Sequence, residues 1–489
     1  MTVRLFIIFL PLLIGLMSLD PPELSIVWSL AGSVFIAGIV QTNWFTESAQ
    51  DESVTRRLLR PGSMFHLMFV VFHIIGGAFH ALNGAGHSFF GTRVPDPTYD
   101  PFVLSYCQRL MLLSHASVTA GMKLVGLHYG FPCYRVRSIP SYCLTMISLI
   151  TLGISTAIAS VPGFQYFASN LAGVSTTSVL VEIFTCVWYR RHKNLVVALV
   201  LFGMNLYSQA VSGWKGTVLF TMITLGALLY HLMPKVVILG GAAFLLVWAL
   251  YFYPFARTLR PLLWYQGLPL DAAIEISIAQ TLNLSLEQRL NIIWSSFSER
   301  VSDLTQFRKY VEYVPKVRPY YGFDIVAGSV VALVPRVFWP EKPNMEALSM
   351  QRVYEAGIAS KRSRISAKSN FYQDAYLSGG EVAIVLACVS LGMFMISINR
   401  LCERLFGGYD IGTCLVYTSL FATPLHVTQN FEYLLGAMAM SILVVCAIFV
   451  VGRSTGWIVS AGKLNHGLQE QARISHAVRS VPIGSVNGC

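Results

Sequence analysis

Residues 236–253 read VVILGGAAFLLVWALYFY and contain no charged side chain. A helix needs roughly twenty mostly apolar residues to cross a bilayer, so this run predicts a membrane span. Hydrophobic residues make up 54% of the chain and charged residues only 12%, which is typical of a protein with many spans. The sequence therefore predicts an all-α polytopic membrane protein with about 12 transmembrane helices. We expect these helices near residues 4–20, 23–40, 63–83, 102–122, 141–160, 168–189, 195–212, 216–233, 236–253, 381–398, 411–427 and 432–451.

Basic residues are unevenly distributed among the connectors of these spans. Short cytoplasmic loops collect Lys and Arg, and here every second connector and the C-terminal tail are rich in them. Both termini are therefore expected in the cytoplasm, and the same alternation places one large loop outside it. This predicts a membrane bundle over residues 1–253, an extracytoplasmic loop over 254–380, three further spans over 381–452 and a cytoplasmic tail over 453–489.

Motifs that would indicate several other functions are missing from the sequence. It has no GxxxxGK(S/T), GxGxxG, HExxH or DxD motif, which argues against nucleotide-driven transport, dinucleotide chemistry and metal-assisted use of nucleotide sugars. The nine cysteines form no CxxC pair, so we expect neither a disulfide framework nor a cysteine metal site. The basic residues behind the net charge of +11 are concentrated in alternate connectors, as in many membrane proteins. We therefore expect no nucleic-acid partner.

The large loop contains the stretch RPYYGFDIVAGSVVALVPRVFWPEKP at residues 318–343. Its apolar part, 325–334, is too short to cross a bilayer, so it predicts an interfacial or re-entrant element. The prolines that follow keep the chain extended and hold Arg336 and Lys342 near headgroup depth. Trp339 is suited to the same depth. The stretch therefore predicts a binding site for an anionic lipid headgroup.

Other residues outside the cytoplasm are candidates for the same ligand. Lys215, in the SGWKG turn at 212–216, either reaches the membrane surface or binds phosphate. Tyr320 and Tyr321 could stack on sugar faces. A guanidinium group matches phosphate oxygens, although most arginines of the loop are equally explained as solvated or paired side chains. The further basic candidates are Arg257, Arg260, Arg300, Arg308, Arg318, Arg352, Lys361, Arg362 and Arg364.

The order of these features, with RPYYG and VPRVFWPEKP as its most specific parts, resembles the Wzy-type oligosaccharide repeat-unit polymerases of bacteria. The specific similarity covers residues 212–216 and 300–385, and hydropathy accounts for the rest. Many members carry Ser-(Lys/Arg)-Gly where this chain has Trp214-Lys215-Gly216. Many also enter the next span through Asn-Phe-Gly, whereas this chain has YLSGG at 376–380. The departures indicate a distant branch.

The resemblance implies a GT-C-like membrane glycosyltransferase in the bacterial inner membrane, active in synthesis of O-antigen, capsule or exopolysaccharide. Its substrate would be a polyprenyl-diphosphate-linked oligosaccharide, and its partners membrane lipids, a chain-length regulator and a flippase. A hydroxyl of the incoming unit would attack the anomeric carbon of the growing chain, with neither a metal ion nor an organic cofactor. Arg336, Lys342 and Lys215 would stabilise the departing diphosphate. The general base would be chosen from Asp324, Asp374 and Glu381.

Three alternatives remain open at this stage. A ligase that moves finished polymer from its lipid to another acceptor would use nearly the same site. A transporter is the rival from a different class, although we find no clear internal repeat of the kind many transporters have. Histidines at 66, 73, 80 and 87 recur every seven residues, and with His115 they could ligate haem. Polar packing inside the bundle explains them more simply.

Overall fold

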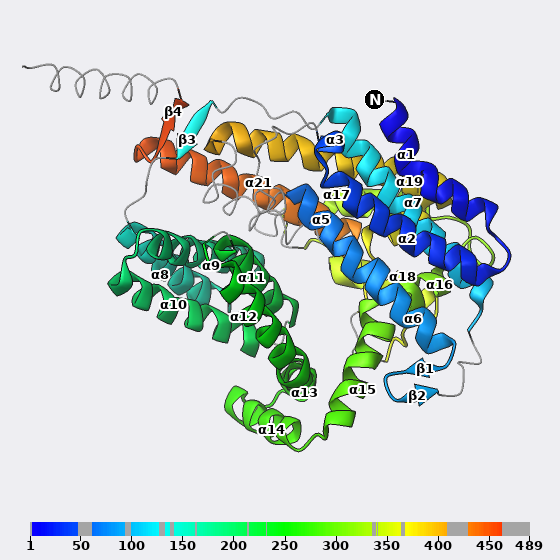
Figure 1. The fold of residues 1–489 in the computed structure, drawn as a ribbon, viewed down its shortest axis with the longest axis horizontal. Helices are drawn as coiled ribbons and strands as arrows, with labels where there is room; N and C mark the ends of the chain where they lie inside the picture. Colours follow the sequence, from blue (N-terminus) through cyan, green and yellow to red (C-terminus); the bar gives the residue numbers. More distant parts are fainter. Residues whose placement is uncertain are drawn as a thin grey trace, which may run out of the picture.

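The chain is described by a computed structural model, and it is helical apart from two small antiparallel strand pairs (Figure 1). The residues that the structure describes are 2–46, 61–92, 99–126, 133–136, 141–161, 164–212, 215–230, 232–334, 339, 341–362, 367–407 and 429–461. The predicted span at 411–427 lies outside the described residues.

A first group of helices surrounds α7 (Pro101–Val125), whose side chains are buried on nearly all sides. α7 packs against α2 (Pro22–Val40) and α19 (Phe371–Phe406). Figure 1 shows α19 and α21 running together along this group. The remaining members are α1 (Thr2–Met17), α3 (Asn43–Thr46), α5 (Pro61–Phe69), the π-helical turn η1 (Val70–Ile75), α6 (Gly76–Gly84) and α21 (Phe431–Ser454).

The contact between α7 and α19 depends on two glycines. A side chain at Gly121 would collide with the backbone of Val389, and one at Gly392 would collide with the backbone of Val118. Small residues at a crossing let helix backbones approach closely, which is a common way to join helices in a membrane. The two helices run in the same direction, because Tyr106 near the start of α7 meets Glu381, whereas Val125 at the end of α7 meets Arg400.

A second group consists of consecutive helices from the middle of the chain. α9 (Gln165–Trp188) packs between α8 (Ser141–Ile158) and α10 (His192–Val211), and α11 (Lys215–Leu229) packs beside them. Figure 1 shows these helices in green, apart from the first group. The long helix made of α12 (Pro234–Val247), the π-helical turn η2 (Trp248–Phe252) and α13 (Tyr253–Trp264) leads away from them.

The segment that follows returns the chain to the first group. α14 (Leu270–Leu282) packs back on α13, and the π-helical turn η3 (Phe297–Val301) contacts α6. α16 (Leu304–Tyr313) contacts α7 and α19, and α17 (Asp324–Ala332) contacts α21. The nine residues of α17 cover the apolar stretch that the sequence predicts to be interfacial or re-entrant. Two further helices belong to this segment, α15 (Leu286–Ser296) and α18 (Met345–Glu355).

Several connectors meet at one end of the first group. Strand β3 (Tyr134–Val136), which follows α7, pairs antiparallel with β4 (Ile458–Ser460), which follows α21. The Nζ atom of Lys123 donates to the Phe45 carbonyl oxygen at 2.8 Å. The Cys133 amide donates to the carbonyl oxygen of Arg404 at 3.1 Å. The second, fourth and tenth connectors and the segment after α21 therefore lie together. Away from this end, β1 (His87–Ser88) pairs with β2 (Gly91–Thr92) in a small hairpin.

Seven helices of the described residues are long and apolar enough to cross a membrane. Three shorter apolar helices lie where further spans are expected: α1, α8 and α11. α7 carries Gln108, Arg109 and His115 and is not among the seven. The chain is thus an all-α membrane protein, as predicted, whereas the count of twelve spans stays a prediction. The seven are Pro22–Val40, Phe65–Gly84, Phe167–Trp188, His192–Val211, Pro234–Trp264, Phe371–Phe406 and Phe431–Ser454.

Candidate functional site

The RPYYG turn, residues 318–322, is bound to a break in α19. Regular helix geometry stops at residues 379–380, which frees carbonyl oxygens of the preceding turn. The Tyr321 amide donates to the Leu377 carbonyl at 2.9 Å, and the Gly322 amide donates to the Ser378 carbonyl at 3.0 Å. Two stretches that the sequence analysis singled out separately are therefore one structural unit.

An open cavity of about 480 Å³, which we call the aromatic cleft, lies beside this unit. Its walls include the rings of Tyr106, Tyr320 and Tyr376, together with Pro315 and Lys316. The rings of Tyr320 and Tyr376 meet edge to face, with centroids 6.1 Å apart and an interplanar angle of 81°. Aromatic faces provide large apolar contact areas, and tyrosine hydroxyls add polar contacts. The cleft therefore suits a ligand with both apolar and hydroxylated faces.

A carboxylate and an ammonium group lie at the aromatic cleft. The Tyr106 hydroxyl donates to Oε1 of Glu381 at 2.9 Å, which joins the outer turns of α7 and α19. Glu381 is exposed and is the first residue after the break in α19. The side chain of Lys316 is exposed as well. The cleft thus combines a cation with aromatic surfaces, and a carboxylate is bound to one of its tyrosines.

The Arg318 side chain is held on the other side of the RPYYG turn. It forms an ion pair with Glu355, and its guanidinium carbon lies 3.8 Å from the centroid of the Tyr321 ring. Glu355 also accepts hydrogen bonds from the Tyr321 hydroxyl at 2.6 Å and from Gln351 at 2.8 Å. Burial raises the pKa of Glu355, but these hydrogen bonds and the Arg318 charge outweigh burial and lower it. Arg318 and Tyr321 therefore stabilise the turn.

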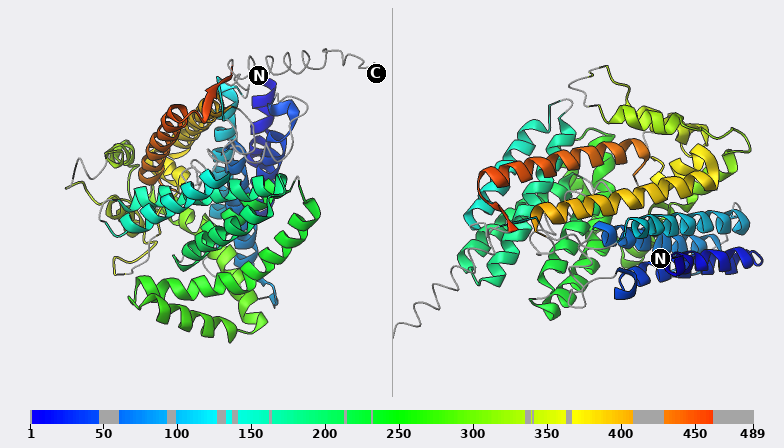
Figure 2. Two further views of the ribbon diagram at one scale, coloured as in Figure 1. Left: turned by 90° about the vertical axis from the view of Figure 1, so that its left-hand side faces the viewer. Right: turned by 90° about the horizontal axis from the view of Figure 1, so that it is seen from above.

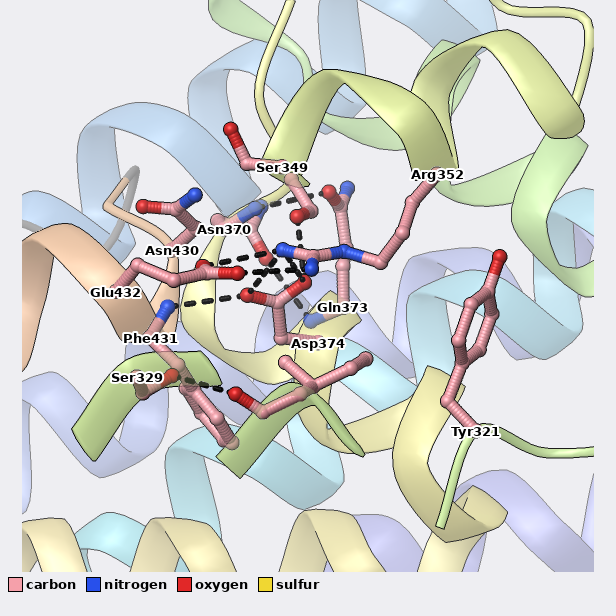
Figure 3. A network of polar contacts seen from close by, with 12 residues as sticks. Tyr321, Ser329, Ser349, Arg352, Asn370, Gln373, Asp374, Asn430, Phe431 and Glu432 are labelled. Carbon is pink, nitrogen blue, oxygen red and sulfur yellow. Dashed lines mark hydrogen bonds and ion pairs between the residues drawn. The ribbon is translucent and has the colours of Figure 1, made fainter. Parts of the chain in front are cut away.

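Arg352 is enclosed in a buried cluster (Figure 3). Its guanidinium donates to Oε1 and Oε2 of Glu432 at 2.8 and 3.1 Å. It also pairs with Oδ1 of Asp374 at 3.2 Å. The side chains of Arg352, Asp374 and Glu432 are only 7%, 0% and 1% exposed. Burial lowers the pKa of Arg352, but Asp374 and Glu432 raise it above its usual value. The cluster ties α18, α19 and α21 together.

Capping interactions fix the ends of the helices at this cluster. The Asp374 carboxylate accepts hydrogen bonds from the Ser369 hydroxyl at 2.5 Å and from the Phe431 amide at 3.0 Å. Asn370 and Gln373 cap each other's backbone amides at the start of α19. Such caps satisfy amides that a helix end would otherwise leave unpaired. Asp374 therefore holds the first turns of α19 and α21 in register and does not face the aromatic cleft's solvent.

Lys342, Asp324 and Trp339 lie around α17. The Nζ atom of Lys342 donates to the carbonyl oxygens of Ala332 and Val334 at 2.8 Å each. These oxygens lie at the C-terminus of α17, where a cation compensates the helix dipole. Asp324 is exposed at the first residue of α17, and Trp339 is 39% exposed. Lys342 is engaged by protein atoms, whereas Asp324 and Trp339 are accessible.

Three residues proposed from the sequence have no described side chain. Arg336 belongs to residues 335–338, which lie outside the described part of the chain. The backbones of Lys215 and Arg300 are described, at the start of α11 and in η3. Their contacts with substrate stay predictions.

Asp303, directly before α16, is a further titratable group of the 254–380 segment. The Tyr372 hydroxyl donates to its Oδ2 atom at 2.9 Å. Burial raises the pKa of Asp303 to about 7, although hydrogen bonds from Tyr372 and Asn370 lower it in part. Asp303 therefore keeps its proton to a higher pH than an exposed aspartate does.

Three of the regularly spaced histidines and His115 lie inside the first helical group. Nδ1 of His66 and Nε2 of His115 are 2.8 Å apart, and both side chains are buried. The direct contact leaves no space for an iron ion between these two nitrogens, which argues against the haem interpretation for this pair. Phe69 stacks on His115, with centroids 4.4 Å apart, and lies 4.3 Å from the ring of His73. His80 is engaged separately, 2.8 Å from the Ser298 carbonyl oxygen.

Within the described ranges, several buried atoms of this histidine group have no hydrogen-bond partner. They are Nε2 of His66, both ring nitrogens of His73, Nδ1 of His115 and Oε1 of Gln108. Each buried polar atom that stays unpaired costs about 1–3 kcal/mol, so buried polar atoms in proteins are nearly always satisfied by protein or water.

The sequence analysis did not single out Tyr106, Lys316 or Tyr376. Tyr106 and Lys316 reach the aromatic cleft from segments more than two hundred residues apart, and no local pattern marks them. Glu432 was also missed. Its signal was present, because a lone carboxylate at the first turn of a strongly apolar helix needs a partner.

These observations define the class of protein, an all-α membrane protein with an aromatic cleft and a buried Arg–carboxylate cluster at one end of its main helical group. Residues 10–460 match the family described as "Domain of unknown function (DUF8712)", so the chain belongs to this family. No curated protein and no solved structure matches the chain.

Proposed function

We propose that this protein is a membrane glycosyltransferase that polymerises lipid-diphosphate-linked oligosaccharide repeat units at the outer face of the bacterial inner membrane. The observation that carries the proposal is the aromatic cleft, where Tyr106, Tyr320 and Tyr376 lie beside Glu381 and Lys316. Aromatic rings bind the apolar faces of sugars. A carboxylate can act as the general base for the attacking hydroxyl, and a cation can stabilise the departing diphosphate.

The proposed topology has about twelve spans, a GT-C-like architecture and both termini in the cytoplasm. It is supported by the basic connectors that meet at the β3–β4 end of the first helical group. The aromatic cleft lies at the opposite end of α7, next to Tyr106. In this orientation the cleft opens outside the cytoplasm, where lipid-linked units are presented.

The proposed reaction forms one glycosidic bond and breaks one bond to diphosphate. A hydroxyl oxygen of the incoming unit attacks the anomeric carbon of the growing chain, and its proton passes to the Glu381 carboxylate. The bond between that carbon and the diphosphate oxygen breaks, and the lipid diphosphate leaves. Lys316 and the predicted ligand Arg336 stabilise the negative charge that develops on the leaving group.

Glu381 suits the role of base better than the other two candidates. It is exposed, and it accepts a hydrogen bond from the hydroxyl of Tyr106, which lines the aromatic cleft. Asp374 is fully buried and already paired with Arg352. Asp324 is exposed on α17, without a described contact to the cleft.

The proposal is tested in a strain that lacks the gene, by separating its lipid-linked and surface polysaccharides on a gel. Wild-type protein should restore long chains, whereas Glu381→Gln and Arg336→Ala should leave mainly single repeat units. Loss of a general base lowers the rate by about 10²–10⁴-fold. Glu275→Gln, at an exposed glutamate of α14, is the matched control and should behave as wild type.

Other outcomes lead to different conclusions. Long polymer that accumulates on its carrier lipid in the deletion strain would identify a ligase. An unchanged polysaccharide profile would contradict both glycosyltransferase readings and favour a transporter. Normal chains from Glu381→Gln in an otherwise confirmed polymerase would exclude Glu381 as the base.

A further inference from the structure

The histidine group inside the first helical group is a second site, separate from the aromatic cleft. His66 and His73 come from the helix made of α5, η1 and α6, and His115 comes from α7. The turn that contains His73 is π-helical, a geometry that is frequent at functional sites. His73 is completely buried, and within the described residues neither of its ring nitrogens has a hydrogen-bond partner.

The contact between His66 and His115 creates a chain of donors and acceptors. A neutral imidazole has one N–H donor and one acceptor nitrogen. If Nδ1 of His66 donates to Nε2 of His115, then Nε2 of His66 is left as an acceptor and Nδ1 of His115 as a donor. The opposite pair of tautomers exchanges these roles. In either case the pair presents one donor and one acceptor to further partners.

Gln108 extends this polar surface toward His73. Its Nε2 atom donates to the His73 carbonyl oxygen at 3.4 Å, while its Oε1 atom is unpaired in the described part of the chain. The unpaired atoms therefore include ring nitrogens that donate, ring nitrogens that accept, and an amide carbonyl oxygen. A small ligand that both donates and accepts can satisfy such a mixed set, and water does both.

The site is connected to the 254–380 segment through α19. The rings of His73 and Tyr372 lie edge to face with centroids 4.8 Å apart. The Tyr372 hydroxyl donates to Asp303, directly before α16. Tyr372 thus stands between the histidine group and a carboxylate of the segment proposed to lie outside the cytoplasm.

We infer that His66, His73, His115 and Gln108 bind water molecules inside the helical bundle, and that this internal water exchanges with the outer solvent past Tyr372 and Asp303. The inference does not depend on the proposed glycosyltransferase function. It assigns a ligand to the most extensive set of unpaired buried polar atoms in the described residues.

Hydroxyl-radical footprinting with X-rays tests the inference on the wild-type protein in detergent or nanodiscs. Radicals that form from bound water modify the side chains beside it, and mass spectrometry locates the modified residue. Phe69 is 0% exposed but lies between His73 and His115, so it should be labelled. Phe202 of α10, which is 7% exposed and belongs to the second helical group, is the control and should be labelled several-fold less. Equal labelling of Phe69 and Phe202 would show a dry site and overturn the inference.

The connection is tested by mixing the protein with ¹⁸O-labelled water shortly before irradiation. Tyr372→Phe removes only the hydroxyl that reaches Asp303, so it should slow the arrival of ¹⁸O at Phe69. Tyr320→Phe removes a hydroxyl at the aromatic cleft and should leave the exchange time unchanged. Unchanged exchange in Tyr372→Phe would overturn the proposed path and leave the water site intact.

Discussion

The guanidinium of Arg352 shows how much depends on the surroundings of a single charge. It lies between carboxylates from two different helices, and all three side chains are almost fully withdrawn from solvent. Arg318, only 34 residues earlier, keeps about a third of its side chain exposed, at 35%. Two arginines of the same segment therefore differ in role: Arg352 holds a buried cluster together, whereas Arg318 forms a partly exposed ion pair.

We expect Arg352→Met to destabilise the protein by about 3–5 kcal/mol, because it leaves Asp374 and Glu432 buried without their partner. Arg318→Met is the matched control, and it should cost only about 0.2–1 kcal/mol, as exposed ion pairs do. Thermal unfolding of the two variants in the same detergent, followed by tryptophan fluorescence, makes the comparison.

Adding Asp374→Asn and Glu432→Gln to Arg352→Met should recover part of the loss, because the remaining side chains then carry no charge. Equal unfolding temperatures for Arg352→Met and Arg318→Met would show that the cluster contributes little to stability.

At the scale of single residues, the sequence could identify candidate site residues, but it could not show which side chains surround them. It singled out Tyr320 and Arg352 together, since both lie in a polar segment with aromatic and basic residues. Only the fold separates them: Tyr320 lies in the aromatic cleft and Arg352 in a closed cluster. The lone carboxylate of Glu432 indicated that it needs a partner, but Arg352 lies 80 positions away in the sequence, and no local pattern identifies it as that partner.

The break in α19 is the element that shapes the cleft. Gly380 has φ 68° and ψ −147°, a backbone conformation that is nearly restricted to glycine. A Cβ atom at this position would also lie 2.8 Å from the hydroxyl oxygen of Tyr320. The neighbouring Gly379 has φ −175°, an extended conformation that other residues adopt.

We expect Gly380→Ala to cost about 1–3 kcal/mol through backbone strain and to displace Tyr320 from its contact with Tyr376. Gly379→Ala should cost much less, because it meets only the Cβ atom of Ala383 at 3.3 Å. Both variants can be compared by thermal unfolding and by the length of the polysaccharide that they support. If Gly379→Ala proved the more harmful of the two, the break would have been assigned to the wrong residue.

At the scale of elements, apolar runs were sufficient to locate most helices, because a membrane span is recognised from its apolar composition alone. The start of α19 was harder to predict. Its hydrophobic run begins at residue 381, yet the helix begins at Phe371 because Asn370 and Gln373 form a capping box. The turns before the break contain Asp374 and are buried, so the hydrophobic run alone does not reveal the first part of the helix.

The described helices form two groups, and the chain returns from the second to the first through α12, α13, α14 and α15 (Figure 1). Figure 2 shows the same ribbon from two further sides. α12 has no buried residue within the described chain. The first group gathers the basic connectors at one end and the aromatic cleft at the other.

The proposed orientation predicts opposite accessibility for two cysteines in otherwise cysteine-free protein. The natural Cys133, exposed beside β3, should react with a membrane-impermeant maleimide only after the inner membrane is permeabilised. A cysteine introduced by Ser285→Cys, at the exposed start of α15, should react once the reagent reaches the outer face of that membrane. The reverse pattern would invert the topology and place the aromatic cleft in the cytoplasm.

The arrangement of the helices in the whole molecule was the hardest feature to predict from the sequence. The alternation of basic connectors predicted which loops share a side, but it carried no information on which helices touch. The aromatic cleft unites Tyr106 with Glu381, and the strand pair β3–β4 unites residues more than three hundred positions apart. Such contacts depend on how the helices pack, and the spacing of hydrophobic residues along the sequence does not reveal it.

The close crossing of α7 and α19 has a mechanical consequence. Gly121 lies against the backbone of Val389, Gly392 lies against that of Val118, and the Tyr106 hydroxyl is bound to Glu381, so we expect the two helices to move as one rigid body. The proton acceptor is therefore preorganised before any ligand arrives. Any opening or closing of the cleft must then come from Pro315 and Lys316, because the turn that contains Tyr320 is bound to α19. Substrate entry would then be a hinge motion of the segment after α16, with the two crossed helices as its fixed frame.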